Sequence, residues 1–529
     1  MPSPLWWTSY TAWAAAVVGV ALRVNRLVDE PYMDEIFHVP QAHQYCQGNW
    51  RYWDGALTTP PGLYLLPAFL AHAQRFLNDT LPAFLRPRWG QVDPCSLPSL
   101  RATNLILVLL LPFLYLSLLS ILHPSSTPSP PSSPRKKPFF LAFTHIPTIP
   151  FAAAGAEWTT LVLALNPLVG WWAWLYYTDI FSLVAVLLAW QYSLRKRYLL
   201  SALVGVASLW FRQTNLIWLL FIAGQAAVSQ LKVAAPSSVH DPLLASCSSP
   251  GLIQTPLSLL TALFRHPLAL LPVLGAYLPV FCAAGAFVRW NGGIVLGDKQ
   301  NHVATIHVPQ LYYFLAFVGV FFAPSILSPR KVGRALTGLG ASPRRILTSA
   351  TMLVALCWTI KRFTIAHPFL LADNRHYTFY LWRRVINVHP LARYALAPGY
   401  ILAGRLIFDE LARAHSTTLS TLLLFVGATS AVLVPTSLLE PRYFIIPLVL
   451  LRLYLFPSPS HPLATSSSSS RYRTRLALEA LLYVAVQAVC VYLFLEKPFL
   501  WDVQVGAEGG KGLEGRDERE VGRLQRFLW

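Results

Sequence analysis

The chain has 529 residues, of which 55% are hydrophobic and only 12% are charged. A soluble protein of this size normally carries about 25% charged residues, so the composition argues against a water-soluble protein. Lys and Arg outnumber Asp and Glu by 42 to 23, which gives a formal net charge of +19. In a soluble domain that excess would suggest nucleic acid. Here the basic residues form short clusters between apolar runs, as the positive-inside rule describes, and we predict a single polytopic membrane domain.

Apolar stretches close to the roughly 20 residues that cross a bilayer recur along the chain. We predict an all-α protein with about 12 to 13 transmembrane helices, luminal loops and interfacial helices. Several stretches are short or contain proline, which a membrane helix tolerates where its neighbours satisfy the freed backbone groups. They lie near residues 11–28, 101–122, 153–173, 178–194, 198–211, 214–231, 267–288, 310–327, 346–363, 394–410, 418–435, 443–457 and 476–496. A shorter, proline-flanked stretch at 61–73 is expected to be interfacial or re-entrant.

The connecting segments are of two chemical kinds. One kind is basic or of low complexity and is expected in the cytosol; it comprises 123–138, 195–197, 328–345 and 458–475. The other kind is compact and polar; it comprises 29–61, 176–179, 212–215, 291–310, 367–377 and 440–443. The two kinds alternate along the chain, so the second kind should gather on the opposite, luminal face, where we expect any chemistry to take place.

These assignments divide the chain into two parts. Residues 1–497 form one transmembrane domain, with a first luminal loop at 29–100, and residues 498–529 form a polar C-terminal tail. The six cysteines show neither CxxC nor zinc-ligand spacing. A disulfide can form only between Cys46 and Cys95, provided that the loop that contains both faces an oxidising lumen. The single N-x-S/T sequon starts at Asn78 in the same loop, which agrees with a luminal placement.

The strongest chemical signal is the motif YMDEIFH, which follows the first apolar stretch. Its adjacent carboxylates, Asp34 and Glu35, repel each other, and partial burial would bring at least one of them into the range of a general base. The structural alternative is a helix N-cap at Asp34, with Glu35 near the positive end of the following helix.

Aromatic residues surround a carboxylate in the segment NWRYWDGALTTPPGLY. Rings such as Trp53 stack on the apolar faces of a sugar, while Asp54 accepts hydrogen bonds from its hydroxyls. The alternative, an aromatic belt at the membrane interface, is favoured for most of these rings.

Three later segments of the luminal kind concentrate cations and hydrogen-bond donors. They are GDKQNH with its continuation to His307, HPFLLADNRHYTFYLW, and LLEPRYF. Ionisable groups at a membrane are costly and are therefore functional candidates. The cations Lys299, Arg375 and Arg442 suit a phosphate group, for which Arg offers the better planar geometry. Internal ion pairs, such as Glu440 with Arg442 or Asp373 with Arg375, are an equally good interpretation.

The histidines of 297–307 are not at HExxH spacing. No Walker loop and no strand-to-helix GxGxxG motif occurs in the sequence, so nucleotide chemistry has no support. The absence of GxSxG likewise disfavours a lipase or esterase.

Together the segments resemble one family, the endoplasmic-reticulum α-1,2-glucosyltransferases that add the third and last glucose to the dolichyl-pyrophosphate-linked N-glycan precursor. The resemblance runs from about Pro31 to Trp529. It rests on YMDEIFHVPQAHQYC, LTTPPGLY, LRATNL, LYYTD, FRQTNLIW, GDKQNH, HPFLLADNRHYTFYLW, LEPRYFIIP and the terminal QRFLW. MDEIFH and LADNRHYTFYLW are specific to the family. Proline-serine insertions, for instance at 458–470, depart from it only in cytosolic loops.

The resemblance implies a GT-C-type helical bundle in the endoplasmic reticulum membrane, with its active site facing the lumen. It implies transfer of glucose from dolichyl-phosphate glucose with inversion, and no cofactor or divalent metal. Asp34 is then the general base, with Glu35 as its supporter or alternate. The remaining site residues follow from residue type and side of the membrane. For the donor phosphate they are Arg375, Arg442 and Lys299, assisted by His376 and His302; for sugar contacts they are Asp373, Asp54 and Trp53.

Two alternatives remain open at the level of sequence. A transporter or scramblase for a lipid-linked sugar would need a similar cavity, but no inverted repeat typical of transporters is visible. A GT-C mannosyltransferase would share the acidic loop, though not the motif LADNRHYTFYLW.

Overall fold

The computed structural model describes residues 2–80, 92–124, 156–297, 299, 303–455, 466–500 and 523–529. Within these ranges the chain is all-α, as predicted, and three isolated β-bridges occur without any strand. His302, all of 81–91, most of 123–138 and parts of 458–475 and 498–529 lie outside the described residues. The α-helices are α1 Pro4–Leu27, α2 Glu35–Cys46, α3 Gly62–Thr80, α4 Leu97–Leu122, α5 Ala156–Ala164, α6 Pro167–Trp171, α7 Thr178–Leu194, α8 Tyr198–Leu209, α9 Asn215–Ala234, α10 Gly251–Arg265, α11 Leu271–Asn291, α12 Pro309–Phe321, α13 Ala323–Ile326, α14 Pro329–Gly340, α15 Pro343–Phe363, α16 Pro368–Ala372, α17 Tyr377–Leu381, α18 Ala392–Ala395, α19 Ala397–Ala414, α20 Leu419–Leu433, α21 Ile445–Tyr454 and α22 Ser466–Glu496.

Six helical segments in the described ranges are long and apolar enough to cross a membrane. Four of them are the helices α1, α4, α9 and α15. The other two are the segment Pro267–Asn291, which contains α11, and residues Arg471–Glu496 of α22. Four shorter apolar helices, α7, α8, α12 and α20, accompany them. These segments confirm a polytopic membrane protein, while the number of 12 to 13 spans stays a prediction.

Proline and capping residues divide some of the stretches that we expected to be continuous. The stretch at 153–173 is broken between α5 and α6, because Pro167 begins a new helix and the Asn166 side chain accepts a hydrogen bond from the Leu168 amide at 3.1 Å. The short stretch at 61–73 belongs to α3, which packs against α2 and is not among the six long spans. Local breaks of this kind make span counts from hydropathy uncertain.

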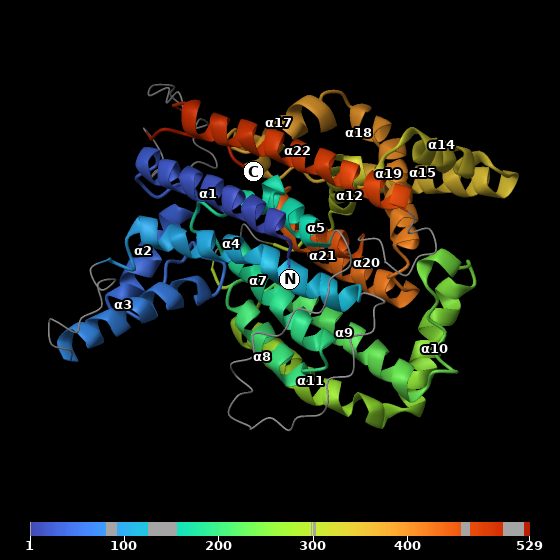
Figure 1. Ribbon diagram of the computed structural model, residues 1–529, viewed down its shortest axis with the longest axis horizontal. Helices are drawn as coiled ribbons and strands as arrows, with labels where there is room; N and C mark the ends of the chain where they lie inside the picture. Colours follow the sequence, from blue (N-terminus) through green and yellow to red (C-terminus); the bar gives the residue numbers. More distant parts are fainter. Residues whose placement is uncertain are drawn as a thin grey trace.

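Figure 1 shows α2 and α3 at one end of the molecule and the pair α14 and α15 at the other. This separation agrees with the expectation that the first loop and the basic segment 328–345 lie on opposite sides of the membrane. Between the two ends the helices pack around α21, in which every residue is buried. Helix α7, which packs against α4, α8 and α9, is also mostly buried. The starts of α7 and α21 are therefore rigidly held.

Candidate functional site

The candidate site lies where several helices begin. Asp34 immediately precedes α2, and Asp179 stands in the first turn of α7. Arg442 lies in the 3₁₀ turn Pro441–Phe444 that leads into α21. The three residues are separated by up to 408 positions in the chain, yet their charges interact. Since helix starts carry a partial positive charge, they favour the carboxylates placed there.

Asp34 and Arg442 form the centre of the site. Arg442 donates a hydrogen bond from Nη1 to Oδ2 of Asp34 at 2.6 Å, and another from Nε to a carboxylate oxygen of Glu440. The Asp34 side chain remains 34% exposed, so a substrate can reach it. Asp34 occupies the N-cap position of α2, but its carboxylate makes no capping hydrogen bond. Pairing with Arg442 thus takes the place of the capping role that the sequence left open.

The charge of Arg442 sets the protonation of Asp34. Burial raises the pKa of Asp34, but the charge of Arg442 and its hydrogen bond outweigh burial and lower the pKa to about 2. Asp34 is therefore ionised at neutral pH. The expectation that burial would raise its pKa towards the range of a general base is wrong for this residue, because the pairing with Arg442 outweighs burial. Beside it, burial lowers the pKa of His38 to about 4, so that this imidazole is neutral at the same pH.

Glu35 has a different environment from Asp34, although the two residues are adjacent. Its side chain is fully buried and receives two hydrogen bonds from Arg101, at 2.9 and 2.6 Å. The backbone amides of Tyr176 and Tyr32 donate to the same carboxylate at 2.7 and 3.1 Å. Glu35 thus connects the first loop to α4 and to the start of α7. This geometry favours the supporting role over that of an alternate base.

Removing the partner of Glu35 should destabilise the protein strongly. We expect Arg101→Met to lower the free energy of unfolding by about 3–5 kcal/mol, because it leaves an uncompensated carboxylate in the interior. The matched control is Arg23→Met, which removes an exposed ion pair with Glu496 and should cost about 0–1 kcal/mol. Thermal denaturation of both variants in detergent measures the difference. Equal effects would show that the Glu35–Arg101 pair does not hold the loop.

Asp373, Arg375 and His376 form a second group near the first. Asp373 accepts two side-chain hydrogen bonds from Arg375, at 2.9 and 2.7 Å, and its Oδ2 lies 3.7 Å from Nε2 of His376. Burial raises the pKa of Glu440, but Arg442 and, to a smaller extent, His376 lower it, and His376 also makes a small contribution to the lowered pKa of Asp34. The second group therefore lies within electrostatic range of the centre. Both internal ion pairs that the sequence offered as an alternative, Asp373–Arg375 and Glu440–Arg442, are therefore present.

The last seven residues reach into this second group. Gln525 accepts a hydrogen bond from Nη1 of Arg375 at 3.0 Å, and the Leu528 amide donates to the backbone carbonyl of Arg375 at 3.0 Å. The backbone oxygen of Trp529 lies 3.0 Å from Nδ1 of His376. Leu528 is fully buried, and Gln525 is 1% exposed. Of the predicted polar tail at 498–529 the structure describes only 498–500 and 523–529, and at this end the apolar terminal motif packs into the bundle.

The C-terminal segment also contacts the first loop. The Tyr32 hydroxyl donates to the carbonyl of Arg526 at 2.6 Å and accepts from the amide of the same residue at 2.8 Å. We call residues 523–529 the C-terminal strap. The sequence signal that points to it is the terminal QRFLW itself, an apolar end on an otherwise acidic and glycine-rich stretch.

Trp53 and Asp54 lie on the loop between α2 and α3, and Lys299 lies on the loop between α11 and α12. The Trp53 ring packs edge-on against Tyr64 with centroids 6.4 Å apart, and Asp54 accepts a hydrogen bond from the Ala56 amide at 2.9 Å. Lys299 is exposed and donates to the backbone carbonyl of Asn291 at 2.6 Å. The two loops touch, since Leu296 N–H donates to the carbonyl of Thr58 at 3.3 Å.

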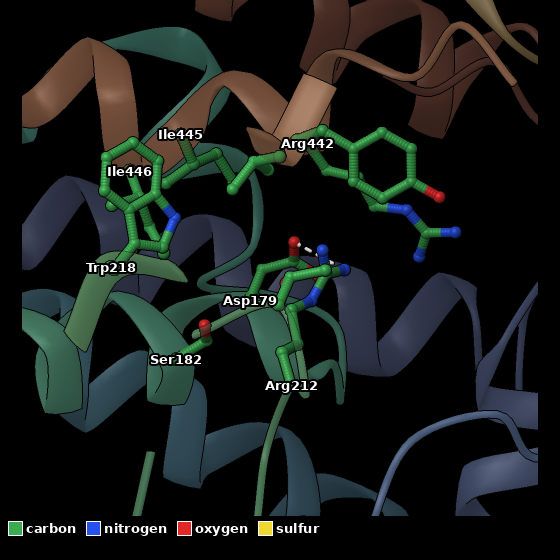
Figure 2. Close-up of a pocket in the computed structure, with 10 residues that line it drawn as sticks. Asp179, Ser182, Arg212, Trp218, Arg442, Ile445 and Ile446 are labelled. Carbon is green, nitrogen blue, oxygen red and sulfur yellow. Dashed lines mark ion pairs between the residues drawn. The ribbon is translucent and has the colours of Figure 1, made fainter. Parts of the chain in front are cut away.

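A pocket opens beside Arg442, at the starts of α7, α9 and α21 (Figure 2). An ion pair between Asp179 and Arg212, 2.9 Å long, forms one side of it. Neither residue was a site candidate from the sequence, where their motifs, LYYTD and FRQTN, only supported the family resemblance.

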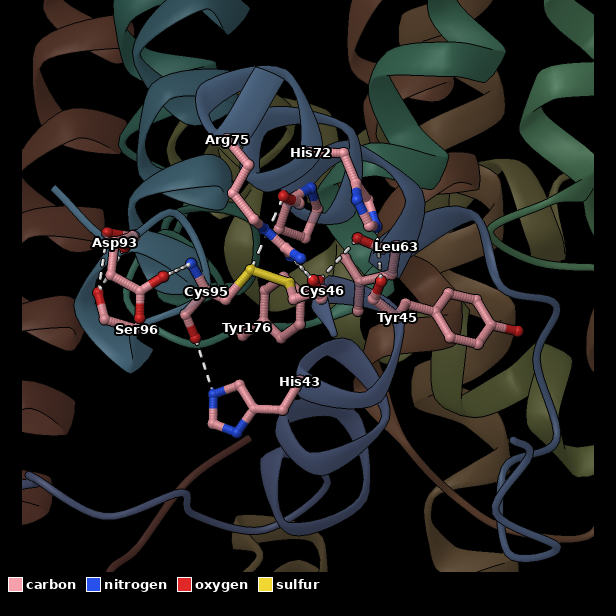
Figure 3. Close-up of a disulfide and its surroundings, with 12 residues drawn as sticks. His43, Tyr45, Cys46, Leu63, His72, Arg75, Asp93, Cys95, Ser96 and Tyr176 are labelled. Atoms are coloured by element: carbon pink, nitrogen blue, oxygen red, sulfur yellow. Dashed lines mark hydrogen bonds between the residues drawn. A yellow bond between two sulfur atoms is a disulfide. The ribbon is translucent and has the colours of Figure 1, made fainter. Parts of the chain in front are cut away.

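A disulfide joins Cys46, at the end of α2, to Cys95, just before α4, and confirms the only pairing that the sequence left open (Figure 3). The carbonyl of Cys95 lies 2.8 Å from Nε2 of His43, and the carbonyl of Cys46 accepts a hydrogen bond from Arg75. The bond closes a loop of 49 residues that includes α3. It therefore fixes α2, which begins beside Asp34, relative to the membrane helix α4.

Loss of this disulfide should lower stability. We expect Cys46→Ser with Cys95→Ser to reduce the free energy of unfolding by about 2–4 kcal/mol, because the unfolded chain gains the entropy of an open loop. Thermal denaturation in detergent, with Cys282→Ser as the control for an exposed free cysteine, measures the effect. If reduction leaves the melting temperature unchanged, the bond does not fix the loop.

The described residues contain no group of three or more His, Cys, Asp or Glu side chains arranged to hold a metal ion. The expectation that catalysis needs no divalent ion stays a prediction.

The fold is an all-helical membrane bundle, and its site contains several carboxylates, of which Asp34 is partly exposed. These features define the class as a polytopic membrane protein with a candidate active site. Comparison with known proteins gives the family. Residues 28–453 match the model of the DIE2/ALG10 family, and the chain belongs to that family. The resemblance inferred from the motifs is thereby confirmed.

Curated relatives match the chain over nearly its whole length. A protein of Arabidopsis thaliana is 33% identical, covering 97% of both chains. A human protein is 35% identical, covering 90% of this chain and 92% of its own. A rat protein is 33% identical over 96% of this chain and 94% of its own. Each is named Dol-P-Glc:Glc(2)Man(9)GlcNAc(2)-PP-Dol alpha-1,2-glucosyltransferase. No solved structure shows a significant match.

Proposed function

We propose that this protein is an inverting glucosyltransferase that moves glucose from dolichyl-phosphate glucose to the terminal glucose of the dolichyl-pyrophosphate-linked N-glycan precursor, forming an α-1,2 bond. The observation that carries the proposal is the near full-length match to relatives that bear this name. The partly exposed carboxylate of Asp34 supports it, since an inverting transfer needs one base.

We place the enzyme in the endoplasmic reticulum membrane, as a GT-C-type bundle whose site faces the lumen. The Cys46–Cys95 disulfide supports this side, because disulfides persist in oxidising compartments and this one lies in the same loop as Asp34. The exposed, basic helix α14 lies at the other end of the molecule, as a cytosolic segment would (Figure 1).

In the proposed reaction, the 2-hydroxyl of the acceptor glucose attacks the anomeric carbon of the donor. The carboxylate of Asp34 takes the hydroxyl proton as the new bond forms, and the bond from the anomeric carbon to the phosphate oxygen breaks with its electron pair. Dolichyl phosphate leaves, and the β-linked donor glucose becomes α-linked. Because a phosphate leaves readily, the step needs no general acid, and nearby cations stabilise the leaving charge instead.

The cations of the site differ in how far their charge is already balanced. Arg442 is paired with Asp34 and Glu440, and Arg375 with Asp373. Among the described residues, no carboxylate lies within ion-pair distance of Lys299. We therefore assign the donor phosphate first to Lys299, with His376 and His302 assisting. Arg442 and Arg375 act chiefly by fixing the carboxylates beside them, and they add hydrogen bonds where a phosphate reaches them.

The remaining carboxylates and rings are assigned to sugar contacts. Trp53 and Asp54 lie on a loop of the luminal kind and combine an apolar face with a hydrogen-bond acceptor, as a pyranose requires. Asp373 is also assigned to a sugar contact, although its carboxylate already accepts two hydrogen bonds from Arg375.

The test is transfer by the purified protein in detergent, supplied with the lipid-linked acceptor and either synthetic dolichyl-phosphate glucose or dolichyl-phosphate mannose. We expect glucose alone to be transferred, and linkage analysis to find an α-1,2 bond. Transfer of mannose would indicate the alternative mannosyltransferase. If the folded protein transfers neither sugar, the alternative of a transporter for a lipid-linked sugar is favoured.

A further inference from the structure

The connection between α15 and α19 carries more positive charge than its side of the membrane explains. Residues 361–396 contain six Lys or Arg residues and one acidic residue, Asp373, which is paired with Arg375. In the proposed orientation this connection faces the lumen, where the positive-inside rule predicts few cations. Lys361 and Arg362 end α15, a position that favours cations. Three arginines remain to be explained.

Packing places this connection at the same end of the bundle as the candidate site. The Tyr312 hydroxyl, in the first turn of α12, lies 2.8 Å from that of Thr359 near the end of α15. Its ring stacks on Tyr400, near the start of α19, with centroids 5.7 Å apart. In the same turn of α12, Gln310 donates to the carbonyl of Leu438 at 2.8 Å, in the loop that leads to the 3₁₀ turn of the site.

Two of the three arginines stand on a π-helical turn, Trp382–Ile386, which directly follows α17. The turn is closed by the Asn387 amide, which donates to the carbonyl of Trp382 at 2.8 Å. Such turns are rare and occur frequently at functional sites. Arg383 and Arg384 are exposed, and no carboxylate among the described residues forms an ion pair with either.

The third arginine is held beside this turn. Arg393 of α18 donates from Nη2 to Oδ1 of Asn387 at 3.1 Å, and α18 packs against the π turn and against α15. Within the described residues Arg393, too, has no carboxylate partner. We call Arg383, Arg384 and Arg393 the arginine patch. It lies at the edge of the bundle, where Figure 1 shows α17 and α18.

Exposed aliphatic side chains alternate along the chain with these arginines. They are 44–64% exposed and comprise Leu381, Val385, Val388 and Leu391. In a membrane protein, exposed apolar and cationic groups together match the boundary between lipid chains and headgroups. The guanidinium fork of arginine suits phosphate oxygens, which it can bind two at a time. The arginine patch therefore fits a lipid phosphate better than a soluble anion.

The proposed reaction involves two lipids with phosphate groups, and the position of the patch distinguishes them. The donor phosphate is bonded to the carbon that is attacked, so it must lie beside Asp34. The π turn begins six residues after His376, about 9 Å further along a helix, which is too far for that phosphate. The pyrophosphate of the acceptor is separated from its terminal glucose by a chain of sugars and lies away from the base. It also carries two negative charges, whereas the donor phosphate carries one.

We propose that the arginine patch binds the pyrophosphate of the lipid-linked acceptor. Arg383 and Arg384 donate to the two phosphate groups, and the aliphatic neighbours contact the dolichyl chain. The proposal rests on the proposed function and adds to it a binding site for the lipid end of the acceptor. Lys299 and His376 continue to serve the donor.

The first test is the double variant Arg383→Gln with Arg384→Gln, which should fold because both side chains are exposed. Donor and lipid-linked acceptor are varied separately. We expect the KM for the acceptor to rise at least about tenfold and the KM for dolichyl-phosphate glucose to change by less than about twofold. The matched control is Arg344→Gln with Arg345→Gln, an exposed arginine pair at the opposite end of α15, for which neither KM should change.

A competition assay identifies the phosphate group itself. Dolichyl pyrophosphate without sugars should inhibit transfer competitively against the lipid-linked acceptor, and its inhibition constant should rise at least about tenfold in the first double variant. Dolichyl phosphate should compete with the donor equally well in both proteins. Because the attraction is electrostatic, added salt should weaken inhibition by dolichyl pyrophosphate more in the unaltered enzyme than in the variant.

Three results would overturn the proposal. The first is a rise in the donor KM alone, and the second is equal behaviour of the two double variants. The third is equal inhibition by phosphatidylserine in detergent micelles, since the patch would then recognise only membrane charge. Absence of α-1,2 transfer by the unaltered enzyme would instead contradict the proposed function. Direct binding of dolichyl pyrophosphate to the purified protein, compared between the unaltered chain and the first variant, would still test the patch.

Discussion

Asp34→Asn should lower kcat for glucosyl transfer by about 10²–10⁴-fold, the range that a positioned general base contributes. The amide keeps the size of the side chain but cannot take the proton of the acceptor hydroxyl. The fold should survive, because the Asp34 side chain is one-third exposed and Arg442 keeps its pairing with Glu440. The measurement is the rate of transfer by purified protein, with the melting temperature taken in parallel.

A comparison with Glu440→Gln separates proton transfer from the positioning of Arg442. Glu440 is the other partner of Arg442, so its loss disturbs the guanidinium while leaving the carboxylate of Asp34 in place. We expect a much smaller fall in kcat than for Asp34→Asn. The control for a carboxylate distant from the site is Asp409→Asn, which breaks a pair with Arg405 on α19. If Asp34→Asn keeps most of the activity, the base is not Asp34 and Glu35 or Asp373 must be considered, of which only Asp373 keeps any exposed surface.

The sequence predicted those features that depend on local pattern. The all-α class follows from apolar stretches of nearly membrane length, and the acidic motif follows from two adjacent carboxylates beside the first of them. Only one disulfide could be predicted, because Cys46 and Cys95 are the only two cysteines that share a predicted loop, and this is the disulfide that the structure contains. These features need no knowledge of how the helices pack.

Contacts between distant segments could not be predicted in the same way. Arg101 stands in an apolar helix, and nothing in its neighbourhood indicates a bond to Glu35, 66 residues earlier. The different environments of Asp34 and Glu35 likewise depend on how the helices pack, because packing brings Asp34 to Arg442 and Glu35 to Arg101. The acidic residues between 502 and 520 made the whole segment 498–529 look polar, and its end contacts Tyr32, which lies 494 residues earlier in the chain.

Leu528→Ala in the C-terminal strap should lower the rate of transfer at least about tenfold, although the residue lies at the end of the chain. Its side chain is fully buried, and its backbone bonds to Arg375 and Tyr377 on either side of His376. Removing a buried leucine side chain typically lowers the free energy of unfolding by about 2–5 kcal/mol. Because Leu528 lies at the chain end, the substitution should mainly detach the strap. The contacts of the strap with His376 and Arg375 are then lost, while the rest of the bundle stays folded.

The matched control lies four residues away in the same strap. Leu524 is 51% exposed, and Leu524→Ala should change the transfer rate and the melting temperature little, since exposed substitutions usually stay within about 0.5 kcal/mol. A merely structural strap would lower the melting temperature of Leu528→Ala with KM for dolichyl-phosphate glucose unchanged in the folded fraction. If the strap positions the residues that bind the donor, Leu528→Ala should raise the KM for dolichyl-phosphate glucose at temperatures where the protein is fully folded. Equal KM values for the two leucine variants would therefore contradict a positioning role and leave the strap as an element of stability alone.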